Sequence, residues 1–361
     1  MRIGRVVAGV VAATAAIGLA AAPAAAHGTS GPEASNYETR VHEISPPTPG
    51  LSVRAIDLGD RLELRNTTGA DVVVLGYEDE PYLRVGPDGV FENRRSPAAY
   101  LNESPDNEDV RLPEIADPEA PPDWRHIGNG DTVSWHEHRA HWMASEDPPA
   151  VRRDRDSRHV VQPFTIELRR QGETIDVSGD VVWVPGPSPW PWLLGALALA
   201  VGVIAGSRLR HWPAVFSVAL TGAIAATAAH LAGEWGASSA SAASTLGGGI
   251  YAIGAVGLGV VALALLIVRD DPSDATPAVL IAGLVLALGA GLADLGSLWH
   301  SQLASTQSPA LVRLEVAAAL GLGVGLAAGA ALRLRRPAPV AARPSPASTE
   351  RSPTEVPAST R

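Results

Sequence analysis

The sequence predicts an exported all-β domain of the immunoglobulin-like sandwich class, followed by an all-α domain of five transmembrane helices. Three observations support this prediction. A leader rich in small apolar residues opens the chain, short stretches of alternating apolar and polar residues fill its first half, and long apolar runs fill its second half. Alternation with a period of two is typical of strands. Apolar runs of about 20 residues are long enough to cross a bilayer.

The leader, residues 1–26, is predicted to be a signal peptide. Arg2 and Arg5 precede an apolar stretch that ends in small residues, which is the pattern of a cleavable leader. Cleavage after Ala26 would leave His27 as the mature N-terminus. A free α-amino group beside an imidazole chelates Cu(II), so His27 is a candidate ligand. The alternative is that His27 follows the cleavage site by chance.

The exported half divides into an arm and a sandwich. Residues 27–50 are rich in proline, glycine and serine and are predicted to form an extended arm. Residues 51–184 are predicted to form the extracytoplasmic sandwich, without helices. Within it, residues 93–130 are polar and proline-rich and are interpreted as a long surface excursion. Strands are predicted at residues 51–56, 62–66, 72–77, 81–85, 90–92, 131–136, 164–169 and 174–184.

The membrane half begins after a proline-rich linker at residues 185–191. Residues 192–332 are predicted to hold the five helices, and residues 333–361 a disordered cytoplasmic tail. The helices are expected at residues 192–207, 213–233, 249–268, 277–299 and 309–332.

Arginines follow the first, third and fifth apolar runs, at Arg208, Arg269 and Arg333 among others. These three sites lie on one side of the membrane if the helices alternate in direction. By the positive-inside rule that side is cytoplasmic. We therefore expect a cell-membrane protein whose N-terminal domain is extracytoplasmic and whose C-terminus is cytoplasmic.

Charge and cysteine usage exclude several classes of function. Residues 27–189 carry 30 Asp and Glu against 16 Arg, a net charge of −14. Such a domain repels nucleic acid and attracts cations. The chain has no cysteine, which excludes disulfides and cysteine-ligated zinc or iron–sulfur sites.

The densest group of candidate ligands lies in residues 135–143, which hold three of the ten histidines. On a strand, His136 and His138 would share one face. A turn after them would bring His141 back toward the pair. Three imidazoles suit copper or zinc, and the thioether of Met143 suits Cu(I).

A plainer interpretation of the same residues remains open. The histidines would then form a solvated strand end, with Trp142 and Met143 packed beneath the loop. Glu137 and Arg139 lie between the histidines, and they would form an ordinary ion pair.

Six ionisable residues interrupt the apolar runs near the expected outer leaflet. Charged groups inside a membrane are costly and usually face protein or water. One interpretation is an outward-facing ion or metal pocket capped by the exported domain. The other is a polar interface in which Arg313 pairs with Asp294 or Glu315. The six residues are His230, Glu234, Asp294, His300, Arg313 and Glu315.

Spacing along the helices constrains this cluster. His230 and Glu234 are four residues apart and share a helix face. Asp294 and His300 are six residues apart, so a regular helix puts them on different sides. No comparable chain of polar groups reaches the inner leaflet, which argues against a complete transport path.

Two segments of the exported domain carry a resemblance to a known family. They run from Leu75-Gly76-Tyr77 to Tyr100-Leu101-Asn102 and from Trp135-His136 to Trp142-Met143. The chain resembles a family of actinobacterial membrane proteins with an exported β-sandwich and C-terminal transmembrane helices. The resemblance implies fold and location but no activity. Through His27 alone, the chain is also similar to exported copper-handling β-sandwich proteins.

These observations predict a membrane-anchored, extracytoplasmic metal-handling protein, with copper favoured and zinc as the alternative ion. The contrasting hypothesis is an envelope scaffold that binds a partner protein through residues 93–130. No nucleophile elbow, phosphate-binding glycine loop or His-Glu-x-x-His pair is present, so an enzyme is not expected.

Overall fold

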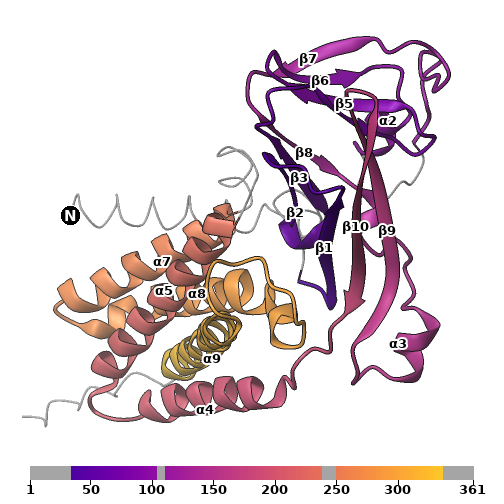
Figure 1. The fold of residues 1–361 in the computed structure, drawn as a ribbon. Helices are drawn as coiled ribbons and strands as arrows, with labels where there is room; N and C mark the ends of the chain where they lie inside the picture. The colour runs from indigo at the N-terminus through magenta and orange to yellow at the C-terminus, as the bar shows by residue number, and fades with distance from the viewer. Residues whose placement is uncertain (1–33, 104–109, 238–248, 336–361) are drawn as a thin grey trace, which may run out of the picture.

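The structure is a computed structural model that describes residues 34–103, 110–237 and 249–335 (Figure 1). The predicted signal peptide, His27 and the tail beyond Arg335 lie outside the described residues. Within the described ranges, an antiparallel β region is followed by a helical region.

Two antiparallel sheets form the β region. The larger sheet has seven strands in the order β1-β10-β9-β4-β5-β6-β7, and the smaller has three in the order β2-β3-β8. The strands of the larger sheet are β1 (Tyr37–Ser45), β10 (Glu173–Trp183), β9 (His159–Arg170), β4 (Val72–Leu75), β5 (Pro81–Gly86), β6 (Gly89–Asn93) and β7 (Trp124–Gly128). Those of the smaller sheet are β2 (Leu51–Ile56), β3 (Arg61–Asn66) and β8 (Thr132–His136).

The core lies between these sheets because alternate residues of their strands face inward. Leu62 and Leu64 of β3 are fully buried, as are Val72 and Val74 of β4, and Trp135 of β8 belongs to the same cluster. The prediction of an N-terminal region built from antiparallel β-sheets is therefore confirmed. Its immunoglobulin-like topology stays a prediction.

The predicted arm requires a correction, because residues 37–45 form strand β1. This strand pairs with β10 from Tyr37 opposite Trp183 to Ser45 opposite Asp176. Its side chains are only half-buried or exposed, since it lies at the edge of the larger sheet. A strand of this kind needs little apolar alternation, so its sequence pattern is weak.

The predicted surface excursion and the absence of helices also need correction. Residues 93–130 contain helix α2 (Ala98–Leu101) and strand β7, which pairs with β6. Helix α3 (Pro149–Arg153) follows β8. Each element is four or five residues long, which is too short to give a clear periodic signal.

Five of the seven α-helices in the described residues are apolar and follow the β region. Four segments are long and apolar enough to cross a membrane by length and composition: Trp212–Ala237, Ile250–Val268, Pro272–Leu292 and Pro309–Leu334. The remaining helix, Trp190–Gly206, has only 17 residues. Only four of the five predicted spans therefore meet this criterion. The five helices are α4 (Trp190–Gly206), α5 (Trp212–Ala237), α7 (Ile250–Val268), α8 (Thr276–Leu286) and α9 (Pro309–Leu334).

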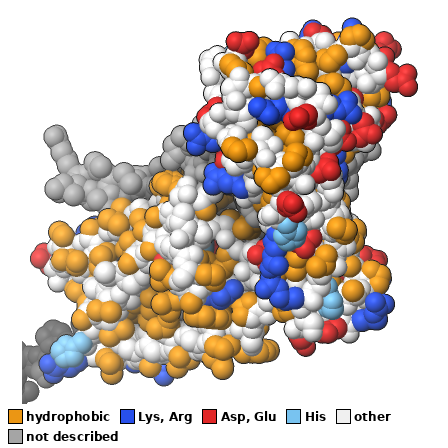
Figure 2. Space-filling view, viewed as in Figure 1, with side chains coloured by type: hydrophobic (Ala, Val, Ile, Leu, Met, Phe, Trp, Pro, Cys, Tyr) orange, Lys and Arg blue, Asp and Glu red, His pale blue; other side chains and the backbone are white. Residues whose placement is uncertain are grey.

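The fourth predicted helix does not run unbroken to residue 299. After α8 it continues as a π-helix at Ala287–Leu292 and then as a 3-10 turn at Leu295–Leu298. Figure 2 shows hydrophobic side chains gathered over the helical region and charged ones over the β region.

Helix α9 contacts α4, α5 and α8 and is the centre of the helical region (Figure 1). Glycines let these backbones approach closely. A Cβ atom at Gly323 would lie 2.7 Å from the Ala287 nitrogen and 2.8 Å from the Gly283 oxygen. Close packing of α8 and α9 at this position therefore depends on a residue without a side chain.

The loop of residues 299–308, which leads into α9, joins the helical region to the β region. Ser301 donates to the Asn36 side chain at 2.8 Å and, through its hydroxyl, to the Val184 carbonyl at 2.9 Å. At the other end of the loop, the Thr306 amide donates to the Gly233 carbonyl of α5 at 3.0 Å. The loop therefore bonds to both regions.

Gly323→Ala is expected to destabilise the helical region. Its methyl group would contact the backbone of α8, and overpacking of this kind costs about 1–3 kcal/mol. Gly254→Ala is the matched control, because a Cβ there meets nothing within 4 Å. The melting temperature of the full chain in detergent should be lower for Gly323→Ala and unchanged for Gly254→Ala. Equal melting temperatures would contradict the close packing of α8 and α9.

Candidate functional site

The histidine cluster predicted from the sequence lies at the end of strand β8 and in the turn that follows it. Trp135 is buried in the core, and His136 is the last residue of the strand, opposite Arg61 of β3. The chain then enters a 3-10 turn at residues 138–140. The prediction that His136 and His138 share one strand face is therefore wrong, since the strand ends between them.

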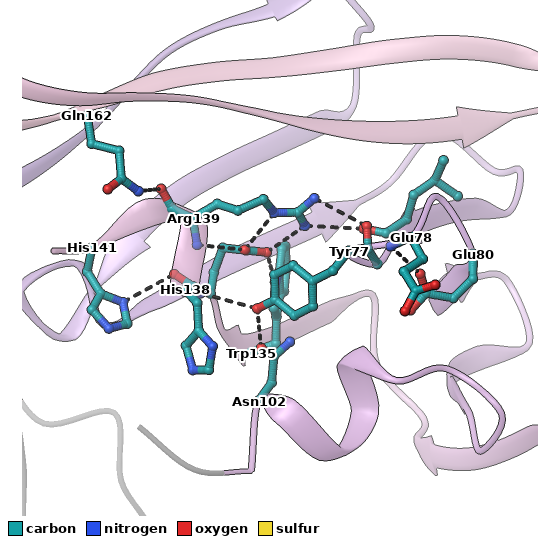
Figure 3. A network of polar contacts seen from close by, with 12 residues as sticks. Tyr77, Glu78, Glu80, Asn102, Trp135, His138, Arg139, His141 and Gln162 are labelled. Atoms are coloured by element: carbon teal, nitrogen blue, oxygen red, sulfur yellow. Dashed lines mark hydrogen bonds and ion pairs between the residues drawn. The ribbon is translucent and has the colours of Figure 1, made fainter. Parts of the chain in front are cut away.

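A buried ion pair holds this turn in place. Glu137 is fully buried, and its two carboxylate oxygens accept from Arg139 Nε at 2.8 Å and Arg139 Nη2 at 2.9 Å (Figure 3). The Trp135 indole also donates to this carboxylate at 2.9 Å. The Arg139 amide donates to it at 3.1 Å, so Glu137 caps the turn that follows it.

Arg139 ties the turn to the loop between β4 and β5. Its guanidinium donates to the carbonyls of Leu75 and Gly76, each at 3.3 Å, and lies over the Tyr77 ring at 4.9 Å. From β9, the Gln162 amide donates to the Arg139 carbonyl at 2.8 Å. Both faces of the turn are thus fixed by the larger sheet and its loops (Figure 3).

The turn brings three imidazole rings together. The ring centroids of His136 lie 4.8 Å from His138 and 4.7 Å from His141, and those of His138 and His141 are 5.8 Å apart. With metal–nitrogen bonds of about 2.0 Å, rings on one tetrahedral ion have centroids roughly 5 Å apart. Rotation about Cβ–Cγ is soft and redirects the nitrogens while leaving the centroid nearly fixed. The centroid spacing is therefore close to that of three imidazoles on one ion, and their nitrogens must turn toward a common point to bind it.

Backbone contacts orient two of these rings. His141 Nδ1 lies 3.2 Å from the Glu137 carbonyl. A carbonyl only accepts, so Nδ1 is the donor and Nε2 of the neutral ring holds the lone pair. Metal-binding histidines commonly show this arrangement. The His138 amide donates to the Tyr77 hydroxyl at 3.3 Å, and the two rings stack.

Tyr77 stays protonated and acts as a fixed partner of the turn. Burial is the main cause that raises the pKa of its hydroxyl above the usual value, and the Glu137 carboxylate raises it further. The hydroxyl donates to the Asn102 side chain while it accepts from His138. A cavity of about 310 Å³ adjoins this group, lined by Arg61, Glu92, Asn102, Glu103, Ser134 and His136 among others.

The other predicted ligands of this site are not joined to it by the described contacts. Met143 is 37% exposed, and no described ring or hydrogen-bond contact links it to the three imidazoles. His27 lies outside the described residues. The Trp142 ring packs against Tyr37 at 6.2 Å, which agrees with the expectation that it lies beneath the loop.

A second cluster lies where α5, the end of the α8 segment and α9 meet. His230 of α5 is only 4% exposed. Its Nε2 atom lies 3.4 Å from Glu234 Oε1 and 3.4 Å from Asp294 Oδ2, and its Nδ1 atom lies 3.7 Å from Glu315 Oε2. Four of the six predicted membrane residues thus come together around one imidazole.

The other two residues behave differently from the prediction. Arg313 donates to the Ser297 carbonyl at 3.1 Å and to the His300 carbonyl at 2.9 Å. Among the described ion pairs it has none with Asp294 or Glu315, so the expected pairing is wrong. The three carboxylates face His230 instead, and His300 contributes its backbone to Arg313.

A regular helix does not predict the observed position of Asp294. The π-helix at residues 287–292 adds backbone per turn and shifts every later side chain around the axis. Asp294 follows this shift and reaches His230. The glycines at 289 and 291 were the available signal, because glycine weakens a helix interior.

In comparisons with protein-family models, curated proteins and solved structures, nothing matches this chain. The resemblance to a family of actinobacterial membrane proteins therefore stays a prediction.

Glu137→Gln is expected to lower the unfolding free energy by about 3–5 kcal/mol, because it leaves the Arg139 charge buried without its partner. The measurement is denaturant unfolding of the full chain in detergent, followed by tryptophan fluorescence. Glu146→Gln is the control, since Glu146 pairs with Arg152 at the surface and its side chain is 77% exposed. Similar losses in both variants would contradict a special role for the buried pair.

Proposed function

We propose that this chain is a membrane-anchored, extracytoplasmic metal-handling protein and not an enzyme. The observation that carries the proposal is the convergence of three imidazoles on one small volume at the end of β8. Copper is the favoured ion and zinc the alternative, because imidazole suits both. His136, His138 and His141 would be the ligands.

The immediate surroundings support this assignment. The buried Glu137–Arg139 pair fixes the turn that carries the rings, so little ordering would be needed when an ion binds. The acidic charge of the β region would raise the local concentration of cations. Met143 and the N-terminal His27 would be additional donors that approach when copper is present.

The membrane arrangement is part of the same proposal. We propose an immunoglobulin-like β region on the extracytoplasmic side and five membrane helices, with α4 as a short span. Arg208 and Arg269 follow α4 and α7, and Arg333 lies in the last turn of α9, which supports a cytoplasmic location for those helix ends. The apolar surface of the helical region in Figure 2 supports contact with lipid.

Combined replacement of His136 and His138 by alanine is expected to weaken Cu(II) or Zn(II) binding by at least about tenfold, since ligands are removed. The measurement is calorimetric titration of the full chain in detergent after metal removal. His159→Ala is the matched control, because that imidazole bonds to the Asp154 carbonyl elsewhere in the β region. Unchanged affinity in the double variant would refute the proposal.

A second candidate function is an envelope scaffold that binds a partner protein. It is favoured by Leu112, Ile115 and Ile127, which lie in the predicted excursion and are between 41% and 45% exposed. Aliphatic side chains exposed on one segment are a common feature of binding surfaces.

Replacement of Leu112 and Ile115 by serine separates this candidate from metal handling. The scaffold function predicts that chemical cross-links to an envelope protein in native membranes are lost, while Cu(II) affinity is unchanged. Metal handling alone predicts no change in cross-linking. The Glu146→Gln variant serves as a control for surface substitutions.

A further inference from the structure

We propose that His230, Glu234 and Asp294 form a second metal site, which takes a divalent first-row transition cation, while Glu315 lies at the other nitrogen of the same imidazole. The site lies at the ends of the membrane helices, beneath the loop of residues 299–308. This site goes beyond the metal-handling function proposed for the β region, because its donors are one imidazole and two carboxylates. Such mixed nitrogen and oxygen donors suit Zn²⁺, Mn²⁺ or Fe²⁺ better than Cu(I).

The spacing of the donor atoms fits an ion. One ligand atom each from His230, Glu234 and Asp294 lies within 4.8 Å of the other two. Ligands bonded to one ion at about 2.0–2.2 Å are separated by at most roughly 4.4 Å. The three atoms are therefore near the spacing of ligands on one ion, and small side-chain rotations would bring them onto it. Glu315 lies on the other side of the same ring.

Hydrogen bonding does not account for the buried imidazole. Both ring nitrogens of His230 lie at ion-pair distance from carboxylates, yet neither has a hydrogen bond within the described residues. Glu315 Oε2 is also buried without one. Buried polar atoms almost always have partners, and a bound cation is one way to supply them. The buried His230 side chain, like the spacing of the donor atoms, therefore points to a bound cation.

The charge balance also favours a cation. Three carboxylates surround a single imidazole, so even a protonated His230 leaves a net negative charge. The nearby Arg313 guanidinium is directed to the carbonyls of Ser297 and His300. Uncompensated charge is costly in a low-dielectric region. A divalent ion bound to a neutral imidazole neutralises two of the three charges without needing Arg313.

The exposed fractions of the four side chains indicate the direction from which an ion would enter. The side chains of His230 and Glu315 are each 6% exposed, whereas those of Glu234 and Asp294 are 41% and 31% exposed. An ion would therefore meet the two partly exposed carboxylates first and the buried imidazole last. The loop above the site reaches it as well, because Gln307 donates to the Ala229 carbonyl of α5 at 2.7 Å.

The test uses the full chain in lipid nanodiscs, freed of metal by a chelator, with His136, His138 and His141 all replaced by alanine. This background removes the site in the β region. Zn²⁺ is titrated by calorimetry, and Mn²⁺ binding is followed by electron paramagnetic resonance. We expect one remaining site. His230→Ala and Asp294→Asn should each weaken it by at least about tenfold.

His211→Ala is the matched control, because His211 is an exposed histidine directly before α5, at the end opposite His230. Glu234→Gln is a conservative variant that keeps the helix packing, and it should also weaken binding. Circular dichroism melts identify any variant that fails to fold. No uptake by the background protein, or uptake unaffected by Asp294→Asn and Glu234→Gln, overturns the proposal and leaves His230 as a protonated counter-ion.

Failure of this proposal is distinguishable from failure of the function proposed for the β region. The second site is measured in a protein without the three β-region histidines. The first is measured as the change that those histidines make in an otherwise intact chain. Either result leaves the other standing.

Discussion

The buried ion pair between Glu137 and Arg139 is the interaction on which the histidine cluster depends. It closes the 3-10 turn that ends β8, and it connects the smaller sheet to the loop between β4 and β5. Because the Glu137 carboxylate is withdrawn from water, it is stable there only while Arg139 and its other donors are in place. The same requirement makes the turn rigid. The three imidazoles stay close together because Glu137 and Arg139 bind each other and the loop between β4 and β5, which fixes the turn that carries the rings.

Much of the β region was predictable because alternation of apolar and polar residues reports burial on one face. That signal is strong in β3 and β8, where Leu62, Leu64 and Trp135 enter the core. It is weak in β1, an edge strand with half-buried side chains, and the sequence there suggested only an arm. Periodicity alone also could not show that the strand ends after His136. The capping carboxylate of Glu137 decides that, and its role depends on Arg139 and on residues distant in the sequence.

The membrane cluster illustrates a different limit. Apolar length located the helices, and the spacing of His230 and Glu234 placed them on one face. The partners across the helices could not be predicted, because a π-helix rotates Asp294 toward His230 and backbone carbonyls compete for Arg313. Opposite charges in a sequence suggest an ion pair, but a carbonyl at a broken helix end is an equally good acceptor for arginine. The two clusters therefore differ in origin. One is built by a turn between sheets, and the other by an irregularity within a helix.

The loop of residues 299–308 has a mechanical consequence. A domain joined to a helical region by one linker, here residues 185–191, can rotate and adopt many orientations relative to it. Bonds from Ser301 to Asn36 and Val184 add a second attachment, made by a part of the chain more than 100 residues away. Two attachments remove rotation about the linker. The cavity beside His136 is thereby held in one orientation relative to the helical region, so a molecule that enters it approaches from a fixed direction.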